Sequence, residues 1–131
     1  MKPFAFRLIK HQPLKASILS QIQKLNIQAG SVMSGVGCLL DVKIRLANES
    51  QSVELKGPLE ILTLSGTITP EHLHLHISVA DNTGKVTGGH LIEGTVSYNS
   101  IPPKYNRKNN IYSKYHQNHS ITCIWMIYEE L

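Results

Sequence analysis

Apolar and polar residues follow a strand-like pattern and then a helical one near the start of the chain. Segment 4–9 is short, β-prone and bounded by prolines at 3 and 13, so it predicts a first strand. Apolar residues then recur at steps of four, four and three, at Leu14, Ile18, Ile22 and Leu25. This spacing predicts a helix that begins near Pro13 and packs one apolar stripe on a sheet. Gly30 lies just beyond the stripe and predicts the end of the helix.

Successive strands are predicted for most of the chain after the helix. Segments 31–46 and 59–69 are rich in branched residues, as expected for half-buried strands. A turn at 47–50 and a break at Gly57-Pro58 flank a shorter strand at 53–56. One early helix followed by hairpins predicts an α+β fold with a mainly antiparallel sheet. At 131 residues, the chain has the size of a single domain.

The clearest alternation in the chain lies in segment 72–80. The two-residue period of a strand divides this segment between two faces. One face is apolar and carries Leu73, Leu75, Ile77 and Val79, whereas the other carries His72, His74, His76 and Ser78. We expect the apolar face to join the core and the opposite face to gather imidazoles.

His90 follows a strong turn signal, the segment 81–85, and is expected on the returning strand of a hairpin. A three-residue loop at 82–84 pairs Asp81 with Lys85 and sets His76 opposite His90. A loop of two or four residues would turn His90 to the apolar face, because a one-residue slip reverses every side chain. A left-handed Gly84 at the third loop position favours the three-residue loop, although a bulge at glycines 88 and 89 would alter the count.

Three neutral imidazoles on a rigid face suit a divalent transition metal. His74 and His76 lie two apart on one side of a strand, and His90 is the candidate third ligand. Zinc is the expected ion, with a fourth position open to a water that becomes acidic enough for hydrolysis near neutral pH. Nickel, iron and copper accept the same ligands. Spacing alone equally allows three exposed strand histidines without a metal.

Two charged residues within apolar segments are further candidates for a functional role. Glu60 is either a carboxylate that orients a histidine, a general base, or a surface glutamate, and it is the single catalytic candidate. Arg45 either holds an anionic ligand or pairs with Glu60 across strands.

Charge and cysteine usage narrow the function classes. The net charge is +4, and segment 104–114 contains four basic residues and no acidic one. Tyrosines interrupt this basic run, which can either contact nucleic acid or form a solvated tail. Cys38 and Cys123 lack the paired spacing of a disulfide framework or a zinc ribbon. No signal peptide or membrane-length apolar run is evident, so we expect a cytoplasmic protein.

Several segments together resemble the plant-and-prokaryote-conserved (PPC) domain over about residues 4 to 96. They are 35–39, 44–48, 57–67, 74–81 and 84–91, and they include Glu-Ile-Leu, His-x-His-x-Ser and Gly-Gly-His motifs in that order. The resemblance implies an α/β fold that assembles as a homotrimer. It also implies metal-binding histidines, as in bacterial and archaeal members, at His74, His76 and His90. His72 falls where the family usually has a small residue, so no ligand role is carried over to it.

Plant members of the family combine this domain with AT-hook motifs that bind DNA, and bacterial members are often labelled DNA-binding by association. An Arg-Gly-Arg-Pro segment of the AT-hook type is missing from this sequence. DNA as a partner therefore rests on analogy.

The C-terminal segment 97–131 departs from the family pattern. It contains all five tyrosines and the only tryptophan, so composition and motif agreement change at the same place. Two explanations stay open, namely natural divergence and a shifted reading frame. Segment 121–128 is β-prone enough for a last strand, which we expect at a subunit edge.

The sequence thus favours a metal-binding homotrimeric PPC-domain protein, with zinc at His74, His76 and His90. Such a site would bind a small ligand or hydrolyse a substrate. The main alternative is a DNA-associated regulatory or assembly module, and a structural oligomer with vestigial histidines is the third reading.

Overall fold

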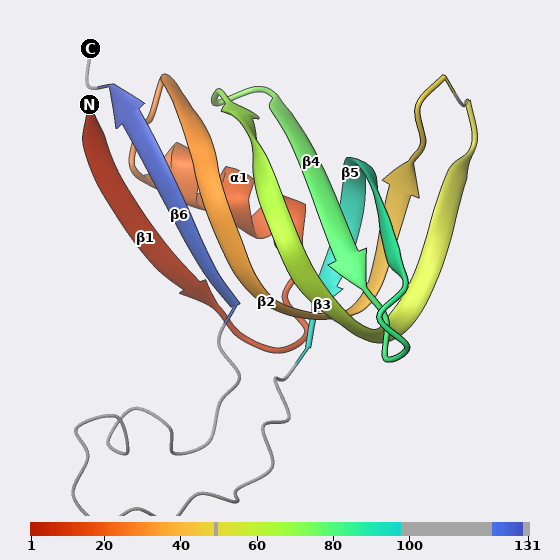
Figure 1. Ribbon diagram of the computed structural model, residues 1–131. Helices are drawn as coiled ribbons and strands as arrows, with labels where there is room; N and C mark the ends of the chain where they lie inside the picture. Colours follow the sequence, from red (N-terminus) through yellow and green to blue (C-terminus); the bar gives the residue numbers. More distant parts are fainter. Residues whose placement is uncertain (49, 98–121, 130–131) are drawn as a thin grey trace, which may run out of the picture.

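The fold is known from a computed structural model that describes residues 1–48, 50–97 and 122–129 (Figure 1). In chain order its elements are β1 (Lys2–Leu8), α1 (Leu14–Lys24), β2 (Ala29–Arg45), β3 (Ser52–Ile68), β4 (Leu73–Ala80), β5 (Val86–Val96) and β6 (Thr122–Glu129). All strand pairings between these elements are antiparallel. The predicted α+β class, with one early helix and an antiparallel sheet, is confirmed.

The sheet has the strand order β1-β6-β2-β3-β4-β5, and β2 also pairs with β5. This additional pairing is possible because β2 is long: its first half lies beside β6, and its second half lies beside β5. The sheet therefore curls until β5 meets the far end of β2 (Figure 1). As a result, residues 90 and 45, which are distant in sequence, lie opposite each other.

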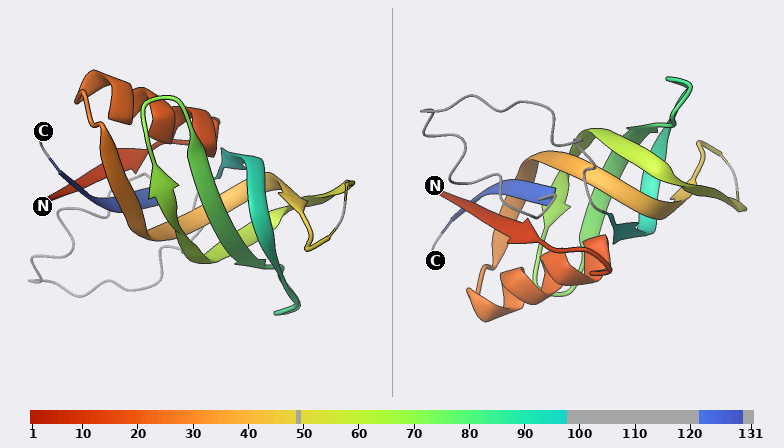
Figure 2. Two further views of the ribbon diagram at one scale, coloured as in Figure 1. Left: turned by 90° about the horizontal axis from the view of Figure 1, so that it is seen from above. Right: turned by 90° about the horizontal axis from the view of Figure 1, so that it is seen from below.

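Helix α1 covers one face of the curled sheet (Figure 2). Leu14, Ile18 and Ile22 are fully buried against the sheet, as their spacing predicted. Burial of each such side chain contributes about 1.5–3 kcal/mol to folding. Leu25, the fourth member of the predicted stripe, is instead exposed, because the helix ends at Lys24.

The helix ends without the glycine that the sequence predicted. Asn26 adopts the left-handed conformation that follows the last turn, with φ of 52°. Asparagine tolerates this conformation better than most residues. Gly30 lies within β2 opposite Ile68, where an added Cβ would lie 2.6 Å from the carbonyl oxygen of Ile127. Its role is thus to allow two strands to approach closely.

Two further expectations about strands are wrong. Gly57-Pro58 does not break the chain, since β3 continues through it while the β2–β3 register shifts by one residue nearby, between Leu39 and Asp41. The C-terminal segment does form a strand, but β6 lies between β1 and β2 within the sheet. Its buried residues, Thr122, Ile124 and Met126, alternate along the strand and face the core.

The start of α1 is fixed by a residue from β5. Both carboxylate oxygens of Glu93 accept hydrogen bonds from the helix, with Lys15 N donating at 2.6 Å and Ala16 N at 3.1 Å. The first N–H groups of a helix have no partner within it, and the helix dipole favours a negative charge there. Pro13 at the N-cap makes no side-chain capping bond, so Glu93 supplies the cap from a distant strand.

In the part of the chain that the structure describes, no helix combines the length and apolar character needed to cross a bilayer.

Candidate metal centre

Strand β4 presents the two faces that its alternation predicted. Leu73, Leu75, Ile77 and Val79 are buried in the core, whereas His74 and His76 are exposed on the opposite face. Ser78 lies on the same face as the histidines, where its Oγ forms a 2.7 Å hydrogen bond with Oγ1 of Thr63 on β3. The side chains of His74 and His76 therefore point away from the core.

The β4–β5 hairpin has the three-residue loop that the sequence predicted. Asp81 N donates to the Lys85 carbonyl at 3.0 Å, and Gly84 N donates to the Asp81 carbonyl at 3.0 Å. Gly84 has φ of 83°, in the region that glycine reaches most readily. With this loop, His76 lies directly opposite His90, and glycines 88 and 89 continue the same register.

The Asp81 carboxylate organises this turn. Its Oδ1 accepts hydrogen bonds from the Thr83 hydroxyl at 2.6 Å, from Thr83 N at 2.8 Å and from Lys85 N at 3.1 Å. These bonds, led by that of the Thr83 hydroxyl, lower the pKa of Asp81. The ionised carboxylate thus stabilises the loop that aligns the two histidine strands.

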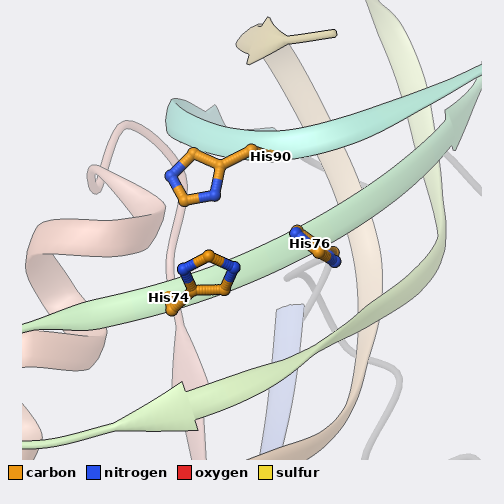
Figure 3. A group of neighbouring side chains, drawn as sticks. All are labelled: His74, His76 and His90. Carbon is orange, nitrogen blue, oxygen red and sulfur yellow. The ribbon is translucent and has the colours of Figure 1, made fainter. Parts of the chain in front are cut away.

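His74, His76 and His90 form a compact cluster on the exposed face of β4 and β5. The ring centroid of His74 lies 5.0 Å from that of His76 and 4.9 Å from that of His90. The ring centroids of His76 and His90 are 5.9 Å apart. One ring nitrogen of each residue lies within 4.8 Å of the others. Figure 3 shows the three imidazoles around a common space, with one nitrogen of His90 directed toward the other two rings.

His90 contains a buried nitrogen that is not satisfied. Its Nδ1 has essentially no contact with solvent and finds no hydrogen-bond partner within residues 1–48, 50–97 and 122–129. Buried polar atoms without partners are rare in folded proteins. A metal ion would supply the missing partner, because a neutral imidazole nitrogen offers a lone pair.

The surroundings of His90 favour its neutral form. Burial is the largest cause, followed by the positive charges of Arg45, His74, Lys15 and His76, and together they lower the pKa of His90 below its ordinary value. A metal ligand must be deprotonated, so this shift suits a coordinating histidine.

The three histidines can converge on a metal ion by side-chain rotation. Nitrogens that share one tetrahedral zinc ion at about 2.0–2.1 Å lie about 3.4 Å apart. The nitrogens of the cluster lie within 4.8 Å of one another, and exposed His74 and His76 can rotate about their side-chain bonds to close the difference. His72, to which no ligand role was assigned, lies outside this cluster in the β3–β4 turn. There its carbonyl oxygen accepts a hydrogen bond from Thr69 N, and its backbone N–H donates to Thr69 Oγ1.

Glu60 is not brought to the histidines. It lies on β3 between Cys38 of β2 and Ala80 of β4. Ala80 follows His76 by four residues along β4, which corresponds to roughly 13 Å at the usual rise of a strand. Burial is the main cause that raises the pKa of the Cys38 thiol, and the negative charge of the Glu60 carboxylate is the second cause. Glu60 therefore stands beside a thiol, not beside an imidazole.

Arg45 is brought to the histidines instead. It lies at the end of β2, opposite Ser52 on β3 and opposite His90 on β5. The cross-strand pairing of Arg45 with Glu60 that the sequence suggested is thus wrong, because the register separates them along β3. No local pattern indicates this position, since the β2–β5 pairing depends on the curl of the sheet.

Lys15 is a second cation near His90 that sequence reasoning missed. Its Nζ donates to the carbonyl oxygen of Leu91, the residue after His90, at 3.4 Å. Lys15 occupies the first turn of α1, and the bond from its backbone N–H to Glu93 holds that turn beside β5. The helical spacing indicated that Lys15 lies between the apolar residues of the helix. It did not reveal which strand packs beside the helix, so it could not place Lys15 near His90.

Two glycines allow the strands of the site to approach closely. An added Cβ at Gly66 on β3 would collide with the carbonyl oxygen of His74, and Gly66 has φ of 148°. At Gly89 on β5, an added Cβ would lie 2.6 Å from the carbonyl oxygen of Arg45. Side chains at either position would displace the backbone that carries the histidines.

The basic run 104–114, for which nucleic-acid contact and a solvated tail were the two alternatives, lies outside the described residues.

Known proteins resemble this chain in sequence and in fold. A bifunctional protein GlmU from Synechococcus sp. (strain JA-3-3Ab) is 39% identical over 98 residues, which are 75% of this chain and 16% of that protein. The chain thus spans only a small part of the length of the curated relatives it matches.

Solved structures share the fold at lower identity. The metal-containing protein AF0104 from Archaeoglobus fulgidus is 23% identical, with a TM-score of 0.72 over 98% of this chain and 79% of that chain. A protein from Bacteroides thetaiotaomicron, named as a candidate DNA-binding protein, is 20% identical, with a TM-score of 0.72 over 98% of this chain and 79% of that one. The Plants and Prokaryotes Conserved (PCC) domain model matches residues 1–101. The chain therefore belongs to the Plants and Prokaryotes Conserved domain family, also written PPC.

Proposed function

We propose that this chain is a metal-binding protein whose ion is held by His74, His76 and His90. The observation that carries the proposal is the buried, unpartnered Nδ1 of His90 within a cluster whose ligand nitrogens lie within 4.8 Å of one another. The fold of a protein described as metal-containing supports it.

Zinc is the ion that we expect, because three neutral imidazoles match its preferred ligands and leave one position open. Zinc held by His74, His76 and His90 would supply a Lewis acid for a small ligand or a hydrolysable substrate. The protein's own part is to hold the three imidazoles aligned on two strands and to favour the neutral form of His90. Glu60 has no role in this proposal beyond its place beside Cys38, so the reaction class stays open between ligand binding and hydrolysis.

Elemental analysis of protein purified without an affinity tag tests the site. We expect close to one transition metal per chain in the wild type, and loss of the metal in His74→Ala, His76→Ala and His90→Ala. His72→Ala is the matched control, because it removes an exposed histidine outside the cluster whose ring centroid lies 6.3 Å from that of His74. Wild-type protein that takes up no metal even after incubation with zinc would contradict the proposal.

The assembly that we propose is a homotrimer, as the family resemblance implies. Val36, Leu62 and Trp125 support self-association, because they lie on adjacent strands β2, β3 and β6 with exposed fractions of 58%, 48% and 54%. Large exposed apolar groups that gather on one surface commonly mark an interface. Light scattering should give about three times the chain mass of 14.6 kDa, and Val36→Glu should lower it.

A DNA-associated assembly module is the second candidate function. Fold relatives named as candidate DNA-binding proteins and the basic run 104–114 favour it. Binding to duplex DNA through basic side chains must weaken steeply as salt rises. Fluorescence anisotropy with labelled duplex at low and high salt tests this candidate, and the absence of binding at low salt would exclude it.

A further inference from the structure

A positively charged residue lies beside the histidine cluster. Arg45 lies directly opposite His90 across the β2–β5 pair. Residues directly opposite in an antiparallel pair have Cβ atoms roughly 4.5–5.5 Å apart and point to the same face. The side chain of Arg45 therefore leaves the sheet on the same face as the His90 ring and at the same position along the strand direction.

No acidic side chain within the described part of the chain pairs with Arg45. Arg45 is exposed, and no ion pair or side-chain hydrogen bond joins it to another residue among 1–48, 50–97 and 122–129. Lys43, two residues earlier on β2, shows the contrast, because its Nζ lies 3.9 Å from Oε1 of Glu54. Arg45 thus has its full set of N–H donors available beside the histidines.

Lys15 adds a second positive charge on the helix side of His90. Its Nζ reaches the Leu91 carbonyl at 3.4 Å, while the carboxylate of Glu93, also on β5, is engaged by the first N–H groups of α1. The electrostatic influence of both Arg45 and Lys15 reaches the His90 ring. The cluster is therefore flanked by two cations, and the Glu93 carboxylate on β5 serves the helix.

We propose that the histidine site takes a small carboxylate-bearing molecule, with the carboxylate bound by Arg45 and a neighbouring oxygen directed to the metal position. The planar fork of an arginine matches the two oxygens of a carboxylate, and such paired bonds give both affinity and orientation. Lys15 contributes attraction for the anion from the other side of His90. This inference rests on the proposed metal site and specifies the class of ligand that the site selects.

The test uses the full-length chain loaded with cobalt(II), whose visible absorption reports on ligands at the metal. Metal content is measured first for the wild type, Arg45→Gln and Lys43→Gln. Each protein is then titrated with glycolate, with its neutral analogue glycolamide and with inorganic phosphate. Lys43→Gln is the matched control, because it removes one positive charge from the same strand and the same exposed face.

We expect glycolate to change the cobalt spectrum of the wild type, and glycolamide to bind more weakly by about tenfold or more. Arg45→Gln should keep its metal and its thermal midpoint but lose about 10- to 100-fold in glycolate affinity, as expected for a charge-assisted bond. Lys43→Gln should bind glycolate like the wild type.

The outcomes separate this inference from the metal proposal. A wild type that holds no cobalt contradicts the metal site itself, before any anion is added. A loaded wild type that binds glycolate and glycolamide equally, or an Arg45→Gln variant with unchanged glycolate affinity, overturns the carboxylate assignment and leaves the metal site standing. Tighter binding of phosphate than of glycolate also overturns it.

Discussion

His76 on β4 lies directly opposite His90 on β5, and their ring centroids are 5.9 Å apart. Both strands are paired on their other side as well, β4 with β3 and β5 with β2. Neither histidine can therefore change its level without disturbing two strand pairs. The backbone positions of the cluster are fixed by the sheet before any metal binds, which is the condition for a preorganised site.

The stability of the metal-free protein should depend on pH through His90. Its pKa in the folded chain lies below the ordinary value of 6.5, mainly because of burial and then because of Arg45 and the other nearby cations. The unfolded chain consequently binds more protons in the interval between the two pKa values. The free energy of unfolding should therefore fall as pH drops through about 6.5 and level off below the folded pKa.

Urea unfolding from pH 8 to pH 5 in the presence of a chelator measures this dependence. His90→Asn removes the titrating group, so its stability should decline less over that interval than the wild type does. His72→Asn serves as the control and should keep the wild-type slope. Parallel curves for the wild type and His90→Asn would show that His90 does not have a lowered pKa.

Replacement of Gly84 tests the turn that sets the histidine register. Its φ of 83° disfavours ordinary side chains, while an added Cβ would meet nothing within 4 Å. Gly84→Ala should thus lose about 1–2 kcal/mol of stability from backbone conformation alone. Gly84→Asn should lose less, because asparagine tolerates this region. Urea denaturation compares the two variants, and equal losses would point to a cause other than conformation.

A side chain at Gly66 should damage both the fold and the site. Gly66 lies opposite Leu75, between the two histidines of β4, and an added Cβ there collides with the His74 carbonyl. Gly66→Ala should lower stability by several kcal/mol, in the range of the most damaging single substitutions. It should also weaken zinc binding more than its loss of stability accounts for.

Gly94→Ala is the matched control for Gly66→Ala. Gly94 also lies in a strand, but the nearest atom to its added Cβ is 3.2 Å away and its φ is not positive. Thermal unfolding and zinc titration of both variants make the comparison. Similar losses in the two proteins would argue against the close contact at His74 as the cause.

Removal of the Glu93 carboxylate should weaken the start of α1. Glu93→Ala leaves the N–H groups of Lys15 and Ala16 without their acceptor and removes a negative charge from the helix N-terminus. We expect a loss of about 1–2 kcal/mol in the free energy of unfolding. Glu54→Ala, which removes an exposed carboxylate 3.9 Å from Lys43, should lose less than about 0.5 kcal/mol. Equal losses would contradict the capping role.

Local sequence patterns were sufficient for the parts of the site that lie within one hairpin. The two-residue period of a strand determined that His74 and His76 share a face opposite Leu75 and Ile77. Loop length determined that His90 lies on the same face as His74 and His76. The number of residues in a hairpin loop sets which residues of the two strands lie opposite each other, and so which face each side chain occupies. The same kind of local rule predicted the buried stripe of α1, and it failed at Leu25 only because Asn26 ends the helix early.

The interior place of β6 could not be deduced from its own residues. A β-prone segment at the chain end is compatible with an edge or an interior position, since its alternation is the same in both. The position of β6 is decided by the gap in the sheet between β1 and β2, two strands that α1 separates in sequence.

The sequence by itself thus determined the three histidines, their common face and the family to which the chain belongs, because periodicity and turn chemistry act over a few residues. Only the tertiary structure decided that Arg45 and Lys15 flank His90, that Glu60 does not, and that Glu93 caps the helix. These contacts join residues more than forty positions apart. They depend on where the long strand β2 bends to meet β5, and this is settled by the packing of the whole sheet around α1.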